Sequence, residues 1–209
     1  GAEETAAEAR DAGAPGVQVL VVPTDVSDEA AVEALVSETV EALGTVDILV
    51  NCAGRLGPSG KETADLLTLE EWNATLSVNL LGPWLGIKYA APVMRANGGG
   101  AIVNVASLAG STPVPGSAAY SASKFGLRAF TFSLAEEIRD SGIKLAVVSP
   151  GPIATQFILA DIDTTSELTF SQPMSSAEEV AQAILDICGN NQREQAIPAM
   201  SGVLTTLVY

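Results

Sequence analysis

The fold is decided by the stretch that contains Ala101-Ile102-Val103-Asn104-Val105-Ala106, an almost wholly apolar run that predicts a buried strand. A helical pattern follows from about Ala118 to Asp140, and after it comes a second apolar run, Lys144-Leu145-Ala146-Val147-Val148. Two strands of one sheet that are joined through a helix run parallel, with the helix packed on one face of the sheet. This unit therefore predicts an α/β protein.

The same alternation continues on both sides of this unit. Apolar runs predict further strands at residues 17–22, 46–50 and 195–198. Helical spacing of apolar residues predicts helices at 28–43, 69–78, 81–96 and 176–188. Ser27 is the expected N-cap of the first of these helices. Because no linker or internal repeat interrupts the pattern, we expect a single domain over residues 1–209, built on a doubly wound parallel sheet.

Composition argues against several classes of function. The net charge is −15 and the ten Lys and Arg residues are scattered, which argues against nucleic-acid or anionic-membrane partners. The chain has no His, so His-based triads and His metal sites are excluded. Cys52 and Cys188 fit no metal-ligand spacing and are expected to be reduced thiols. The missing His residues and the Cys spacing lead us to expect no bound metal. Because the chain has reduced thiols and no apolar run of about 18 residues, we expect a cytoplasmic protein.

Tyr120 and Lys124 carry the clearest chemical signal in the chain. A Tyr four residues before a Lys on a helix places both side chains on one face, one turn apart. An ammonium beside a phenol favours the phenolate and lowers the pKa of the Tyr from about 10 toward neutrality. The pair therefore predicts a Tyr that acts as general acid or base. The alternative is a half-buried Tyr and a solvated Lys on an ordinary helix.

Other notable residues follow the predicted strands directly. They are Asp25 after the strand at 17–22, Asn51-Cys52-Ala53-Gly54 after 46–50, Ser107 after 101–106, and Pro150 to Thr155 after 144–148. Singly, each could be an ordinary turn residue. The carboxyl ends of parallel strands meet at one edge of the sheet, where ligands bind in such folds. Four such groups, with Tyr120 close in sequence, indicate a ligand site at that edge.

These motifs together resemble those of the short-chain dehydrogenase/reductase family. Asn51-Cys52-Ala53-Gly54 is similar to the family's Asn-Asn-Ala-Gly motif, with Cys in the second position. Ser107 stands thirteen residues before Tyr120, as the family's Ser stands before its Tyr-x-x-x-Lys motif. The remaining matches are Asn79 with the family's helix Asn, Asp25-Val26 with its adenine-contacting Asp, and Pro150-Gly151 and Thr155 with its Pro-Gly-x-x-x-Thr stretch. The resemblance covers residue 1 to about residue 190 and implies a Rossmann-like sheet.

The resemblance implies an NAD(P)-dependent oxidoreductase that interconverts a secondary alcohol and a ketone by hydride transfer. Tyr120 is then the general acid/base, and Ser107 holds the reacting oxygen. Lys124 lowers the pKa of Tyr120 and holds the nicotinamide ribose, while Asn79 positions a water behind Lys124. The residues expected to bind NAD or NADP are Asp25, Val26, Asn51, Ala53, Gly54, Tyr120, Lys124, Pro150, Gly151, Ile153 and Thr155. A non-catalytic protein that binds a ligand or partner through the same fold is the alternative.

Substrate and assembly are expected from the same resemblance. The loop from Gln156 to Pro173 normally closes over substrate in this family, and its many apolar residues favour a small apolar carbonyl or alcohol compound. A homodimer or homotetramer is expected through the helices at 81–96 and 118–140. The apolar side chains of the second helix spread around more than one of its faces, which leaves one face for a second copy; they are Phe125, Leu127, Phe130, Phe132 and Leu134.

The chain departs from the family at its start. The family opens with a strand, a Gly-rich Thr-Gly-x-x-x-Gly-x-Gly turn and a second strand, and residues 3–12 resemble the helix that follows them. We therefore expect the first two strands to be missing from this chain. Roughly forty residues are expected before Gly1, since a nucleotide-binding βαβ unit takes about 30 residues or more. The second of those strands carries the residue that separates NAD from NADP, so this choice stays open.

Overall fold

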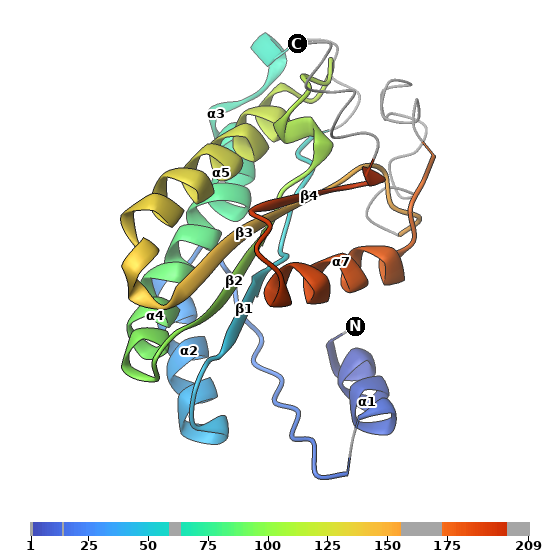
Figure 1. The fold of residues 1–209 in the computed structure, drawn as a ribbon. Coiled ribbons are helices and arrows are strands. Elements are labelled where there is room, and N and C mark those ends of the chain that lie inside the picture. Colours follow the sequence, from blue (N-terminus) through green and yellow to red (C-terminus); the bar gives the residue numbers. More distant parts are fainter. Residues whose placement is uncertain (1, 14, 59–63, 156–172, 200–209) are drawn as a thin grey trace.

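The computed structural model describes residues 2–13, 15–58, 64–155 and 173–199, which form a parallel sheet with helices on both faces (Figure 1). The strand order is β1-β2-β3-β4, and every pair of neighbours is parallel. The strands are β1 (Ile48–Asn51), β2 (Gly100–Val105), β3 (Ile143–Pro150) and β4 (Glu194–Ile197). The helices are α1 (Ala2–Ala12), α2 (Glu29–Leu43), α3 (Leu69–Leu76), α4 (Gly82–Ala96), α5 (Ala118–Glu137) and α7 (Ala177–Gly189). Short turns are η1 (Ala64–Leu66), the π-helical η2 (Ser77–Leu81), η3 (Leu108–Gly110) and η4 (Arg139–Ser141).

Helices α4 and α5 cover one face of the sheet, and α2 packs on the outside of α4 (Figure 1). Ala90 and Met94 of α4 are fully buried against Ile102 of β2. Leu127 of α5 packs in the same layer against Val147 of β3. Because full burial of one such large apolar side chain contributes about 1.5–3 kcal/mol, this layer fixes α5 firmly on the sheet.

Helix α7 covers the opposite face. Its buried side chains Val180, Ala183 and Ile187 pack against β2 and β3. A capping box starts the helix, since Ser176 Oγ accepts from the N–H of Glu179 at 3.1 Å and the Glu179 carboxylate accepts from the N–H of Ser176 at 2.7 Å. Helix α1 lies on the same side of the sheet as α7 (Figure 1). None of the described helices is long and apolar enough to cross a membrane.

The expected strand at 17–22 is wrong. These residues belong to no ladder, and the apolar side chains of Val17 and Leu20 are exposed. The Val19 carbonyl instead accepts a hydrogen bond from the Arg10 side chain at 3.3 Å. A strand exists only where a neighbour pairs with its N–H and C=O groups, and none of the described strands lies beside this segment. The other expected strands and the helices are present, with their ends shifted as is usual for such predictions.

The expected N-cap of α2 is also corrected. Asp28, and not Ser27, caps the helix, because its carboxylate accepts from the N–H of Ala30 at 2.9 Å. Ser27 donates instead to Asp25 Oδ1, from its N–H at 2.9 Å and from its hydroxyl at 2.7 Å. Ser and Asp cap helices about equally well, so residue type alone does not separate the two positions.

Candidate active site

The site begins where β2 ends. Ser107 comes after Ala106, just beyond the end of the strand, and it is the N-cap of the turn η3. Its Oγ accepts a hydrogen bond from the N–H of Ala109. The same hydroxyl interacts with the phenol of Tyr120, in the first turn of α5, and this interaction lowers the pKa of the phenol. The expected meeting of the strand end with the Tyr of the helix is therefore present in the structure.

Lys124 lies one turn along α5 and is 4% exposed. Its Nζ donates to the carbonyl of Val105, the last residue of β2, at 2.9 Å, and lies 5.7 Å from the centre of the Tyr120 ring. Close packing of η3 on the helix supports this arrangement. A Cβ at Gly110 would lie 2.8 Å from the carbonyl oxygen of Lys124, so only Gly permits this approach without a shift.

The pKa values of the pair are dominated by burial. Burial raises the pKa of the Tyr120 phenol, and the hydrogen bond with Ser107 opposes that rise only in part. This direction is opposite to the one expected from the Tyr–Lys spacing. Burial lowers the pKa of Lys124 from 10.5 to about 8, against an opposing charge interaction with Cys52. The spacing predicted that the two side chains lie close together, as the 5.7 Å distance shows, but not that burial dominates both pKa values.

Asn79 lies in the middle of the π-helical turn η2 and is fully buried. Its Nδ2 donates to the carbonyl of Arg55 at 2.8 Å and to Ser123 Oγ at 2.9 Å. Its Oδ1 accepts from the N–H of Arg55 at 2.8 Å. Both N–H groups of the side chain are therefore used within the protein. The water-positioning role expected for Asn79 stays a prediction.

The segment after β1 runs between these side chains. A Cβ at Gly54 would lie 3.8 Å from Asn79 Oδ1 and 3.9 Å from Lys124 Nζ, so the Gly54 backbone passes close to both. Ala53 and Cys52 are exposed just before it. The side chain of Asn51 turns inward, where its Nδ2 donates to Asn104 Oδ1 at 2.8 Å.

The remaining expected cofactor residues lie on two other connections. After β3, the N–H of Gly151 donates to the carbonyl of Ile197 at 2.7 Å, and a Cβ there would lie 3.2 Å from Leu108, the residue after Ser107. Ile153 forms a bridge with Ser175, and the N–H of Thr155 donates to the carbonyl of Ile153. The Pro150 to Thr155 segment therefore starts beside the Ser107 turn.

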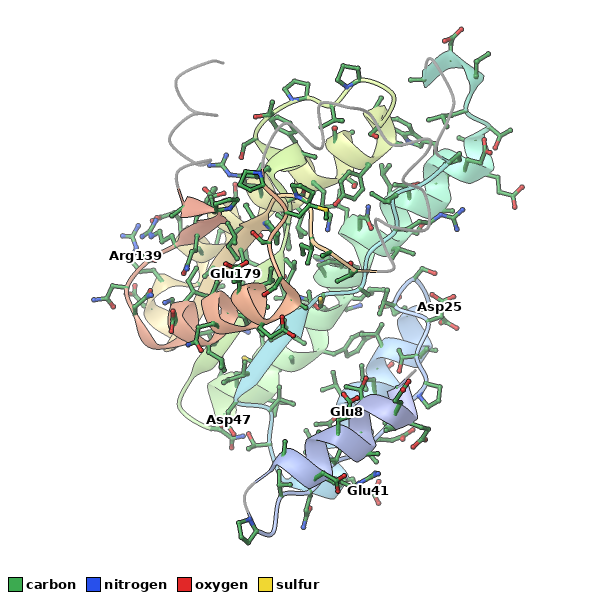
Figure 2. All side chains as sticks on the ribbon, turned by 90° about the vertical axis from the view of Figure 1, so that its right-hand side faces the viewer. Glu8, Asp25, Glu41, Asp47, Arg139 and Glu179 are labelled. Carbon is green, nitrogen blue, oxygen red and sulfur yellow. The ribbon has the colours of Figure 1, made fainter. Side chains whose placement is uncertain are left out.

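Asp25 and Val26 lie in the turn that leads into α2, where Figure 2 labels Asp25. The two hydrogen bonds from Ser27 lower the pKa of the Asp25 carboxyl group. Val26 packs on the first residue of α4, since a Cβ at Gly82 would lie 3.0 Å from the Val26 side chain. The structure thus ties this turn to the start of α4, and not directly to Tyr120 or Lys124.

A cavity of about 250 Å³ lies beside Tyr120. One wall comes from the connection between β1 and α3, and the other from the segment that leads into α5. The described residues that line it are Leu56, Pro58, Ala64, Leu67, Pro115, Gly116, Ser117, Ala118, Ala119 and Tyr120. None of these residues has a charged side chain, and Tyr120 becomes charged only when its phenol loses a proton. The loop expected to close over substrate falls on residues 156–173, of which 156–172 lie outside the described residues.

Sequence reasoning missed two members of the site. The Val105 carbonyl, which accepts from Lys124, has no side-chain signal in the sequence. Ser123 stands directly before Lys124 and contacts both Asn79 and the carbonyl of Tyr120, but a Ser on a helix gives no hint of its partner. The one sequence feature that could have marked Ser123 as part of the site is its position between Tyr120 and Lys124.

A parallel sheet covered on both faces, with polar groups gathered where its strands end, defines a Rossmann-like α/β protein. The family model described as short chain dehydrogenase matches residues 1–165. The chain belongs to this family of oxidoreductases, and the fold class expected from the sequence is confirmed.

Relatives and solved structures agree with this assignment. A short-chain dehydrogenase/reductase from Hericium erinaceus is 40% identical over 156 residues, which cover 73% of this chain and 60% of that protein. The 2-(R)-hydroxypropyl-CoM dehydrogenase of Xanthobacter autotrophicus is 34% identical over 180 residues, 83% of this chain and 72% of that protein. The crystal structure of levodione reductase has a TM-score of 0.77 at 31% identity, over 88% of this chain and 74% of that one. The chain thus spans well under the full length of these relatives.

Proposed function

We propose that the protein is an NAD(P)-dependent oxidoreductase that interconverts a secondary alcohol and a ketone, with Tyr120 as general acid/base. One observation carries the proposal: Lys124 is buried one turn from Tyr120, with its Nζ 5.7 Å from the centre of the Tyr120 ring and bonded to the Val105 carbonyl at the end of β2. The alternative, in which Lys124 is a solvated side chain on an ordinary helix, does not hold, because Lys124 is 4% exposed. No observation favours the non-catalytic alternative.

The proton chemistry follows from the burial of Tyr120. Because its pKa is raised, the phenol keeps its proton at neutral pH and can give it to a carbonyl oxygen in the direction of reduction. The Ser107 hydroxyl stabilises the negative charge that develops on that oxygen. The Lys124 ammonium then stabilises the phenolate that remains. In the direction of oxidation the same phenolate takes the proton from the alcohol.

The residues fit a nicotinamide dinucleotide at this edge of the sheet. Gly54 presents bare backbone beside Lys124, which permits a close approach of a ligand. Asp25 uses one carboxylate oxygen for both Ser27 bonds, which leaves the other as an acceptor for the amino group of an adenine. Ala53 follows β1, and Gly151, Ile153 and Thr155 follow β3, so they extend the proposed cofactor site. The bound nicotinamide supplies or takes up the hydride; NAD and NADP are both candidates.

The cavity beside Tyr120 supports an apolar substrate. Its described walls offer aliphatic side chains and backbone, with Ser117 as the polar exception. An apolar group of the substrate packs there, while the carbonyl oxygen faces Ser107 and Tyr120. A neutral ketone or secondary alcohol with an aliphatic or alicyclic substituent fits this arrangement. We also infer a cytoplasmic location, which the two free cysteines support.

Replacing Tyr120 by Phe tests the proposal. The change removes only the hydroxyl, so the fold should persist while turnover falls by about 10²–10⁴-fold. Tyr89→Phe is the matched control, because it removes a hydroxyl that donates to Glu29 on the surface between α2 and α4. Absorbance change of the nicotinamide, measured with NAD and NADP forms against a panel of ketones and secondary alcohols, gives the rates. Near-native turnover by Tyr120→Phe would refute the assignment. Absence of any turnover by the unmodified protein would favour a binding protein.

A further inference from the structure

Ser123 is a buried hydroxyl to which the chemistry above gives no role. It lies between Tyr120 and Lys124 on α5 and is 0% exposed. Its Oγ donates to the carbonyl of Tyr120 at 2.7 Å and accepts from Asn79 Nδ2 at 2.9 Å. Ser123 therefore connects the helix of the Tyr–Lys pair with the π-helical turn η2.

The connection continues from Asn79 to the segment after β1. The Asn79 side chain pairs with Arg55 through two hydrogen bonds, both of 2.8 Å, one to its carbonyl and one from its N–H. Arg55 directly follows Gly54, the backbone of which passes close to Asn79 and Lys124. Three segments that are far apart in the sequence, β1 to Arg55, η2 and α5, thus share one hydrogen-bond network.

The direction of each hydrogen bond in this network is determined. A Ser hydroxyl has a single proton, and that of Ser123 is given to the Tyr120 carbonyl, so toward Asn79 its oxygen can only accept. Asn79 must then present its N–H groups toward Ser123 and the Arg55 carbonyl, and its oxygen toward the Arg55 N–H. The reversed amide would lose all three bonds. A network with one satisfied arrangement holds its members rigidly.

We propose that Ser123 is a positioning residue that fixes Asn79 and, through it, the Gly54–Arg55 backbone against the helix of Tyr120 and Lys124. It touches no reacting atom. Its contribution to turnover rests on the proposed function, in which the Gly54 backbone permits a close approach of the cofactor. The positioning of Asn79 and Arg55 by these hydrogen bonds does not depend on the proposed function. Without Ser123, one N–H of Asn79 loses its acceptor in a site closed to water, and the amide can rotate away from Arg55.

The chain offers a closely matched control in Thr131, two turns further along α5. Thr131 is also 0% exposed. Its Oγ1 donates to the Leu127 carbonyl at 2.6 Å and accepts from Asn104 Nδ2 at 2.8 Å. Ser123 and Thr131 therefore make the same two kinds of bond on one helix. Thr131 leads through Asn104 to Asn51, whereas only Ser123 reaches Asn79 and Arg55. Loss of either hydroxyl removes one buried donor and one buried acceptor, so both variants should lose a similar amount of folding stability.

The experiment compares Ser123→Ala and Ser123→Thr with Thr131→Val. Hydrogen–deuterium exchange of the peptide that contains Arg55 is the first readout, because the Arg55 N–H donates to Asn79. Ser123→Ala should speed this exchange by about tenfold or more relative to the unmodified protein, and Thr131→Val should leave it unchanged. Ser123→Thr keeps a hydroxyl that can make the same back-bond, so it should restore the slow exchange.

Turnover is the second readout. Ser123→Ala should lower kcat/KM by roughly ten- to a hundred-fold and raise the KM for the nicotinamide cofactor, since misplacement by about 1 Å costs up to about 10²-fold. Unchanged exchange at Arg55 in Ser123→Ala, or equally fast exchange there in Thr131→Val, would overturn the proposal. Faster exchange at Arg55, in a protein whose unmodified form turns over no substrate, would support the positioning role and refute the proposed function instead.

Discussion

Lys124 is a cation held in a nearly dry site, and its charge has an energetic cost. The side chain is 4% exposed, and burial lowers its pKa from 10.5 to about 8. The folded protein therefore binds this proton less tightly than the unfolded chain does. The carbonyl of Val105 accepts one hydrogen bond from the ammonium but carries no full charge to balance it. A charge kept where folding disfavours it is typical of functional sites.

The stability of the protein should therefore rise between about pH 8 and pH 10. Below pH 8 the amine is protonated in both states, and the folded state bears the full cost of the buried charge. Between 8 and 10.5 the unfolded chain keeps the proton while the folded protein has lost it. The free energy of unfolding then increases by up to about 1.4 kcal/mol per pH unit, about 3 kcal/mol in all. Lys124→Met should lack this rise in urea unfolding measured from about pH 7 to pH 10.

The comparison of the two proteins isolates Lys124 from other titrating groups. Burial also lowers the pKa of Lys144, whose Nζ donates to the carbonyls of Ile187 and Asn190 at the end of α7. Lys144 acts in the same direction in both proteins, so its effect cancels in the difference. Identical pH dependence of the two unfolding free energies would contradict a buried, protonated Lys124.

At the scale of elements, the alternation of apolar runs and helical patterns predicts most of the fold. The unit from β2 through α5 to β3 follows from local patterns alone. Its two strands are buried on both sides and read as continuous apolar runs, and its helix is buried on one side and shows helical spacing of apolar residues. The segment 17–22 fails because apolar composition describes a strand's side chains and says nothing of the neighbour that must pair with it. Local pattern therefore predicts elements better than it predicts their pairing.

The same distinction applies to the site. A strand end and a helix face together predict that Ser107, Tyr120 and Lys124 meet, since both rules depend on positions along the chain. The bonds of Ser123 and Asn79, and the π-helical turn between α3 and α4, depend on side-chain contacts between distant segments. The direction of the Tyr120 pKa depends on burial, which no spacing reports.

The connection between β1 and α3 supplies a wall of the cavity beside Tyr120, and Leu67 tests it. Leu67 lines this cavity, whereas Leu69, at the start of α3, is 75% exposed and lies outside it. If the cavity takes the apolar part of the substrate, Leu67→Ala should lower kcat/KM for bulky alicyclic ketones by about 10-fold or more relative to small ketones. Leu69→Ala should leave this ratio unchanged. Equal ratios in both variants would place the apolar part of the substrate elsewhere.

At the scale of the whole molecule, the described surface contains a groove that no charged residue lines. The chain has 25 acidic residues, and Figure 2 shows Glu8, Glu41, Asp47 and Glu179 on separate parts of the molecule. A groove of about 450 Å³ between η2, α4 and α5 is lined without any charged residue, by Asn73, Leu76, Ser77, Leu80, Leu81, Trp84, Gly126 and Phe130. Two copies of a protein of net charge −15 repel each other least where such an uncharged face meets its equivalent.

We expect this groove to be the contact between two copies in a homodimer or in half of a homotetramer. Leu81 and Trp84, which line it, are 39% and 43% exposed, and large aromatic side chains dominate the energy of such contacts. Trp84→Glu places a charge in the centre of the face and should convert the assembly to monomers. Leu185→Glu is the control, because Leu185 is 63% exposed on α7, which covers the opposite face of the sheet. Light scattering at micromolar concentration measures both variants and the unmodified protein. A monomeric unmodified protein, or a Trp84→Glu variant that stays associated, would show that this groove is not where two copies meet.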